Sequence, residues 1–79
     1  MTLEIISAQE VSFTGEVSAV TLPGKMGSFT VLKDHAPIIS VLVKGDVKYT
    51  TSEDGAEHSL PIAGGLVDVN HNRISVCIY

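Results

Sequence analysis

The segment Thr21–Pro37, TLPGKMGSFTVLKDHAP, decides how this 79-residue chain is interpreted. It contains a Pro-Gly pair, a second glycine, an apolar run and an Asp-His-Ala-Pro corner. This order predicts a loop, a strand and a second loop. The segment has no pair of acids, no nucleophile beside a base and no glycine-lysine phosphate loop, so it lacks the features of an active site.

The same strand-like spacing continues over the rest of the chain. Short runs rich in Val, Ile and Thr alternate with turn residues, and no stripe of helical period lasts for three turns. The expected strands are Thr2–Ile6, Val11–Leu22, Ser28–Leu32, Ile38–Leu42, Gly45–Thr51, Glu57–Ile62, Leu66–Val69 and Arg73–Ile78. Short strands with turns at this spacing predict an all-β fold, either a β-sandwich or a flattened barrel, with residues 1–79 as a single domain.

The turn residues predict how the strands are connected. The Pro-Gly pair at 23–24 suits the centre of a type II turn. The Asp-Gly pair at 54–55 supplies the positive φ angles of a tight hairpin, and the Asn-His-Asn run at 70–72 serves similarly. The Gly-Gly pair at 64–65 would let the chain pass between sheets. Gly15 is expected to mark a bulge in the long second strand.

Composition excludes several classes of function. Net charge is −4 and the five Lys and Arg residues are scattered, so no nucleic acid is expected as a partner. Charged residues are 18% of the chain, below the ~25% of typical soluble domains. Either this is ordinary variation, or a partner protein covers part of the exterior. No signal-peptide pattern and no apolar run of ~20 residues occurs, so no direct membrane insertion is expected.

Candidate chemical groups are few and dispersed. Cys77, the single cysteine, is expected to be a small buried apolar residue in a reducing compartment. The spacing of His35, His58 and His71 matches no compact ligand motif, so no metal and no cofactor is expected. His35 has two open interpretations, a corner residue whose ring bonds the backbone or a contact with another protein. The glycine-rich turn around Lys25 lacks the spacing and helix of a phosphate loop.

Two apolar residues accompany that turn. Phe29 is expected to return to the core with its strand. Met26 is expected at the exposed tip, either as an adaptable contact or as an isolated apolar residue without function.

Six segments in order resemble the epsilon subunit of the F-type ATP synthase, called delta in mitochondria, from Leu3 to Ile78. LEIISAQ is similar to the family's opening strand and turn, FTGEV to its F-S-G-x-V, and TLPGKMG to its L-P-G-x-x-G. HAP at His35–Pro37 is the most recognisable triplet of the family. AGGLVDV at Ala63–Val69 resembles S-G-G-x-L-E-V, and NRISVCI resembles N-x-V-T-V-L-A.

The resemblance implies a sandwich of two five-stranded sheets without catalytic residues. It implies a central-stalk subunit that links gamma to the c ring and rotates with them, coupling proton flow to ATP synthesis. The implied location is peripheral, on the cytoplasmic face of the bacterial inner membrane. Residues at gamma-facing positions of the family are Ser7, His35 and Ser40. Residues at c-ring-facing positions are Lys25, Met26, Gly27 and Ser28.

The chain departs from the family pattern in two respects. Met26 and Ser28 stand where acids are frequent, and Thr30 and Lys33 replace a usual glycine and proline. Hydrogen bonds and packing of Met26 are therefore expected to replace an electrostatic ring contact, and the loop before HAP is expected to follow a different path. The family usually continues into a C-terminal helical hairpin that can inhibit ATP hydrolysis in bacteria. A subunit ending at Tyr79 would couple without inhibiting by that route, whereas a piece of a longer protein would look the same.

Two alternatives come from other classes of function. One is a small β-sandwich binding module that recognises a peptide or a sugar, which would need a concave aromatic surface. Four aromatic residues and no Trp speak against it. The other is a metal-dependent enzyme that uses His35, His58 and His71.

Overall fold

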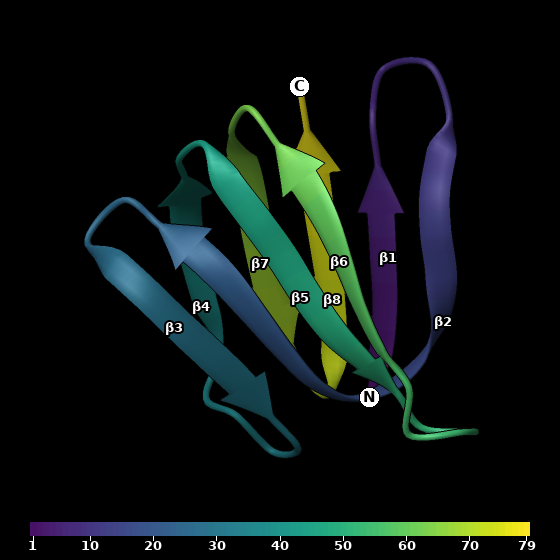
Figure 1. The fold of residues 1–79 in the computed structure, drawn as a ribbon. Coiled ribbons are helices and arrows are strands. Elements are labelled where there is room, and N and C mark those ends of the chain that lie inside the picture. The colour runs from purple at the N-terminus through teal and green to yellow at the C-terminus, as the bar shows by residue number, and fades with distance from the viewer.

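The computed structural model describes residues 1–79 and contains eight strands and no helix (Figure 1). The strands are β1 (Thr2–Ile6), β2 (Val11–Gly24), β3 (Gly27–Leu32), β4 (Ile38–Leu42), β5 (Gly45–Thr51), β6 (Glu57–Ile62), β7 (Gly65–Asn70) and β8 (Arg73–Ile78). The predicted bounds of β1, β4, β5, β6 and β8 are confirmed, and the others differ by one or two residues at an end. No helix is present that is long and apolar enough to cross a membrane.

The long strand β2 belongs to both layers of the fold. Through Glu16 it pairs with β1, and from Val17 onward it pairs with β5. One layer therefore runs β4-β7-β8-β1-β2, and the other runs β3-β2-β5-β6 (Figure 1). The predicted β-sandwich is confirmed. With β2 counted in both, its layers have five and four strands, close to the two five-stranded sheets that the resemblance implies.

Alternating side chains place the core between the two layers. All thirteen core residues are apolar, and no polar or charged residue is buried among them. Each large side chain removed from water contributes roughly 1.5–3 kcal/mol. The core residues are Leu3, Ile5, Val17, Val20, Leu22, Val31, Leu42, Val47, Ile62, Val67, Val69, Ile74 and Val76. Because the interior holds no polar group, any functional site has to lie on the surface.

β2 has two bulges, one at Ser12 opposite β1 and one at Ser18 opposite β5, so the bulge expected near Gly15 is not at Gly15 itself but three residues to either side. The two β2 residues on either side of Ser18 face consecutive residues of β5, which leaves Ser18 as the extra residue. Gly15 instead makes room for an aromatic ring, since an added Cβ would lie 2.9 Å from Phe13. The Phe13 ring packs on Tyr49 with centroids 4.4 Å apart. The smallest residue is therefore needed for packing there.

The centre of the turn between β2 and β3 lies two residues further along the chain than predicted, at 25–26 and not at 23–24. Pro23 and Gly24 are the last residues of β2, and Lys25 and Met26 form the centre of the turn. Gly24 pairs with Gly27, and a Cβ on Gly24 would lie 2.7 Å from the Gly27 carbonyl oxygen. The Pro-Gly pair therefore permits close strand pairing and is not the centre of a type II turn.

The connections around β7 follow the prediction. The β7–β8 turn has His71 and Asn72 at φ of 48° and 60°, between the paired residues Asn70 and Arg73. Two left-handed residues in a two-residue hairpin match a type I′ turn. On the other side of β7, residues 63–64 carry the chain from β6 in one layer to β7 in the other.

The β5–β6 hairpin is longer than the predicted tight turn. Only Gly55 has a positive φ, of 68°. The Asp54 carboxylate accepts hydrogen bonds from the Thr51 hydroxyl and from the Ala56 amide, the latter at 3.0 Å. A carboxylate that accepts two such bonds organises the loop as an Asx-type turn.

Asp54 should make the stability of this hairpin dependent on pH. The Thr51 hydroxyl, followed by the Ala56 amide, lowers the pKa of Asp54 from its ordinary value of 3.8. The unfolded state then binds the proton more tightly, so the contribution is complete above that value and lost as pH falls through the lower folded pKa. Unfolding free energies of wild type and Asp54→Asn should differ at neutral pH and converge below pH 3.8. A difference that stays constant to the acid limit of folding would contradict this.

Cys77 is exposed, and the prediction of a buried thiol is wrong. Ile74 and Val76 face the core, so the alternation of β8 turns Cys77 to the outside. Apolar neighbours in the sequence of a strand point to the opposite face and do not bury the residue between them.

Candidate functional site

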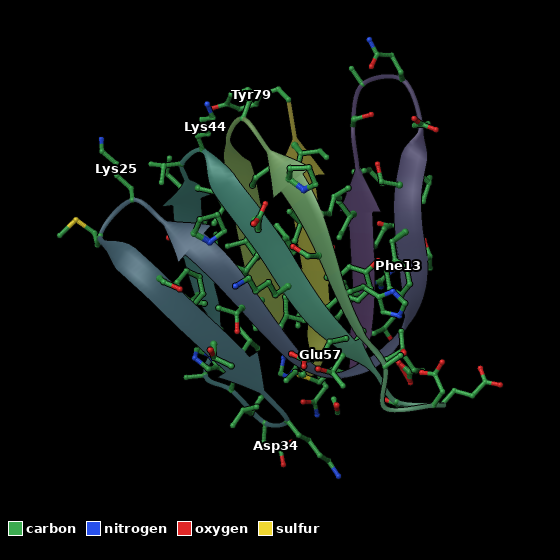
Figure 2. All side chains as sticks on the ribbon, in the orientation of Figure 1. Phe13, Lys25, Asp34, Lys44, Glu57 and Tyr79 are labelled. Atoms are coloured by element: carbon green, nitrogen blue, oxygen red, sulfur yellow. The ribbon has the colours of Figure 1, made fainter.

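The sandwich has two ends, and the predicted contact residues lie at both. β1 and β8 run parallel, with Thr2 beside Arg73 and Ile6 beside Cys77. The β1–β2 loop therefore shares one end with Tyr79, and we call it the Tyr79 end. The β7–β8 turn shares the other end with Met1, and we call it the Met1 end. Figure 2 shows Lys25, Lys44 and Tyr79 at the Tyr79 end and Asp34 at the Met1 end.

The turn with the predicted c-ring-facing residues lies at the Tyr79 end. Lys25, Met26, Gly27 and Ser28 are contiguous and all exposed. Met26 is 98% exposed, so its predicted place at the tip is confirmed. Phe29 packs against the core, also as predicted. The turn thus presents an ammonium group and a thioether to solvent, which suits a contact with another protein.

Two backbone hydrogen bonds hold this turn against β4 of the other layer. The Lys25 amide donates to the Val41 carbonyl at 2.9 Å, and the Val43 amide donates to the Pro23 carbonyl at 2.9 Å. Gly24 also pairs with Leu42. Because the strand before the turn is fixed on both sides, Met26 is presented on a defined support.

Ser7 lies at the same end and organises the β1–β2 loop. Its amide donates to the Glu10 carbonyl at 2.9 Å. Its hydroxyl oxygen accepts from the amides of Gln9 and Glu10 at 3.4 and 3.3 Å. These bonds give Ser7 a structural role within its loop, and its contact with gamma stays a prediction.

His35 lies at the Met1 end, in the corner between β3 and β4. Its amide donates to the Leu32 carbonyl at 3.1 Å, and its ring Nδ1 lies 2.6 Å from the Ala36 carbonyl oxygen. Because a carbonyl only accepts, Nδ1 carries the proton and Nε2 remains free for another group. The interpretation that the ring bonds the backbone is confirmed, and the free Nε2 leaves a protein contact open.

Asn72 approaches this corner from the β7–β8 turn. The Asp34 amide donates to Asn72 Oδ1 at 2.7 Å, and Asn72 Nδ2 donates to Asp34 Oδ1 at 3.0 Å. The two residues border a small polar hollow together with His35, Pro37 and His71. Sequence reasoning missed this pair, and its only signal was that Asp and Asn both tolerate a left-handed backbone.

Ser40 is apart from both Ser7 and His35. It lies in β4 opposite the buried Val67, so it faces the inner side of its sheet and is half-buried. Its hydroxyl donates to the Val41 carbonyl at 3.4 Å. The structure thus separates the three predicted gamma-facing residues, whose role stays a prediction. A partner that contacts both Ser7 and His35 has to extend along the sandwich.

The three histidines are not gathered in one place. His35 and His71 border the same hollow. His58 lies on β6 in the other layer, where its ring stacks on Tyr49 with centroids 5.2 Å apart. No group of three or more His, Cys, Asp or Glu residues is placed to hold a metal ion.

An apolar row crosses the outer face of the five-stranded layer, and sequence reasoning did not predict it. Its members are neighbours in register on five strands, and all except the half-buried Ile6 are exposed. We call it the outer row: Val41, Leu66, Cys77, Ile6 and Val11. The adjacent row on the same face is polar except for the exposed Ile39 on β4, and its members are Ile39, Asp68, Ser75, Glu4 and Thr14. A continuous apolar strip beside polar residues is typical of a surface that contacts protein.

Comparison with known proteins gives consistent matches over almost the whole chain. The family model for the ATP synthase delta/epsilon chain β-sandwich domain matches residues 1–78. The ATP synthase epsilon chain of Chlorobaculum tepidum is 42% identical over 72 residues, 91% of this chain and 81% of that one. The epsilon chain of Bordetella petrii is 38% identical over 74 residues, 94% of this chain and 52% of the relative. This chain therefore spans about half the length of some relatives.

Two solved structures share the fold. A chain of the Euglena gracilis mitochondrial ATP synthase, resolved with OSCP, F1 and the c-ring, superposes with a TM-score of 0.87 at 24% identity. The match covers 96% of this chain and 48% of that one. A chain of the Tetrahymena thermophila central stalk and c-ring structure gives a TM-score of 0.79 at 19% identity, covering 99% and 62%.

Proposed function

Because this chain belongs to the delta/epsilon family of ATP synthase subunits, we propose that it is a non-catalytic subunit of the central stalk. In this role residues 1–79 act as one sandwich unit that joins gamma to the c ring and rotates with them. Proton flow through the ring then drives ATP synthesis elsewhere in the complex. The observation that carries the proposal is the family match over residues 1–78.

The surface of the chain supports a structural role. The core has no polar side chain, and no group of three or more His, Cys, Asp or Glu residues is placed to hold a metal ion. Exposed apolar residues occur instead at the Lys25–Ser28 turn and along the outer row. The alternative of a sugar- or peptide-binding module is not favoured, because Phe13 and Tyr49 pack on each other and on the core.

The family consists of subunits of a membrane-associated complex. The most similar relatives named above are bacterial, and we place this subunit on the cytoplasmic face of the bacterial inner membrane. Attachment there passes through gamma and the c ring, with no insertion of this chain into lipid.

The first test is association with the gamma subunit from the same organism, measured by calorimetry. One-to-one binding is expected, and His35→Ala should weaken it about tenfold, the usual range for truncating a contact residue. Ser59→Ala, on the exposed side of β6, is the matched control and should bind as wild type. Failure of the wild-type chain to bind a folded gamma would refute the stalk role.

The ring-facing turn gives a second prediction. Met26→Ser removes the thioether from a tip that is 98% exposed, so the melting temperature should not change. Contact with the c ring should weaken by about 1 kcal/mol, roughly fivefold. ATP synthesis in vesicles that contain the complete complex should fall accordingly, whereas Met26→Leu should retain it. If Met26→Ser supported the same rate of ATP synthesis as Met26→Leu and wild type, Met26 would not face the ring.

A further inference from the structure

The β3–β4 corner, residues 33–37, is hydrogen-bonded to other elements of the fold through a single pair of residues. The only backbone hydrogen bond of residues 33–37 runs from His35 to Leu32, within the same loop region. The ring of His35 bonds the adjacent residue Ala36. The two bonds between Asp34 and Asn72 are therefore the only hydrogen bonds from this corner to another element of the fold.

Those two bonds are reciprocal, and their geometry is specific. Each residue donates one bond and accepts one, at 2.7 and 3.0 Å. Paired bonds fix the orientation of two groups as well as their separation, and the one to the carboxylate is charge-assisted. Asp34 and Asn72 both have left-handed φ angles, of 64° and 60°. Asp and Asn adopt such angles more readily than other residues that carry a Cβ, and the two bonds hold both in this conformation.

We infer that Asp34 and Asn72 are positioning residues that hold the His35–Pro37 corner in place for its contact with gamma. This inference rests on the proposed function. The clamp, meaning the Asp34–Asn72 pair, orders the corner before binding, with His35 Nε2 left free. A loop ordered in advance loses less conformational freedom on association, so the complex is tighter than with a loose corner.

The chain offers a reversible test of the clamp. N72D removes the Nδ2 donor and places two carboxylates face to face, so the corner should detach and binding to gamma should weaken about tenfold. In D34N/N72D the side-chain amide at position 34 donates to the carboxylate at position 72. The same carboxylate accepts from the backbone amide of position 34, so both bonds are restored. Binding should return to within about twofold of wild type. D34N alone retains an acceptor for Asn72 Nδ2 but loses the charge assistance, so it should weaken binding by no more than about twofold.

Ser59→Ala, on the exposed side of β6 and away from the corner, is the control for a surface substitution. It touches neither the clamp nor the hollow beside His35, so binding to gamma should not change. Melting temperatures of all variants establish that the sandwich is folded.

Amide hydrogen exchange in the free protein separates the clamp from the gamma contact. The backbone amide of position 34 should be protected from exchange in wild type, D34N and the double variant. In N72D it should exchange about tenfold faster. If N72D loses this protection but binds gamma normally, the positioning role is refuted. It is also refuted if the double variant regains protection without regaining affinity. If wild type shows protection but no gamma binding, the proposed function fails, and the clamp is only a loop-ordering element.

Discussion

The Gly65→Ala variant is expected to lose about 3 kcal/mol of stability or to remain unfolded. A Cβ at this position would lie 2.3 Å from the Cys77 carbonyl oxygen and 3.2 Å from its carbonyl carbon. Both atoms belong to the backbone of β8, which is paired with β7 over its whole length. A rotamer change cannot relieve this clash, so the two strands would have to separate where six core residues are anchored on them and on β1.

Urea denaturation of Gly65→Ala and Gly55→Ala provides the comparison. Gly55 has a φ of 68° and no atom within 4 Å of an added Cβ, so its replacement should cost only about 1 kcal/mol of backbone strain. Total stability for a small domain is of the order of 5 kcal/mol, so only the first variant is expected to approach the unfolding threshold. If Gly65→Ala lost no more than Gly55→Ala, the close approach of β7 and β8 would be wrong.

The Leu3→Ala variant should lose about 2–5 kcal/mol, the range for removing a large side chain from a packed core. Leu3, the second residue of β1, is completely buried. It pairs with Gly15 on one side and with Ile74 on the other, so a cavity there would lie between three strands. No polar group is buried in the core, so the cavity would stay dry and empty.

The neighbouring residue Glu4 is the control for this variant, since it lies on the outer side of β1. Glu4→Ala should change the unfolding free energy by less than about 0.5 kcal/mol. The midpoint of urea unfolding should move for Leu3→Ala at an unchanged slope, because the surface exposed on unfolding is nearly the same. Equal midpoints for the two variants would place Leu3 outside the core.

Much of the fold could be predicted from the sequence because its strands follow a simple period. The period of two in β8 places Ile74 and Val76 on the inward face, and the Asn-His-Asn run at 70–72 predicted the hairpin between β7 and β8. The prediction of a buried Cys77 is wrong because its apolar neighbours in the sequence lie on the opposite face of the strand. The bulges at Ser12 and Ser18 were missed because a serine bulge has no local signature, whereas the nearby Gly15 has one.

Less of the candidate site could be predicted from the sequence. The exposed tip at Met26 follows from turn chemistry, and its neighbours follow from the resemblance. Pairing of Asp34 with Asn72 depends on how β3 and β8 are brought to one end, which no local pattern encodes. The outer row was equally hidden, because it arises only when the register of five strands is known.

The parallel pairing of β1 with β8 has a consequence for how the chain acquires its fold. β1 pairs with β2 on one side and with β8 on the other. The second pairing can form only after β8 has been synthesised, since Thr2 pairs with Arg73 and Ile6 with Cys77. Pairings this distant in sequence slow folding, and all-β domains of this kind fold in milliseconds to seconds. During synthesis, one edge of β1 stays open until β8 has left the ribosome. Nascent chains are therefore most exposed to aggregation just before β8 emerges.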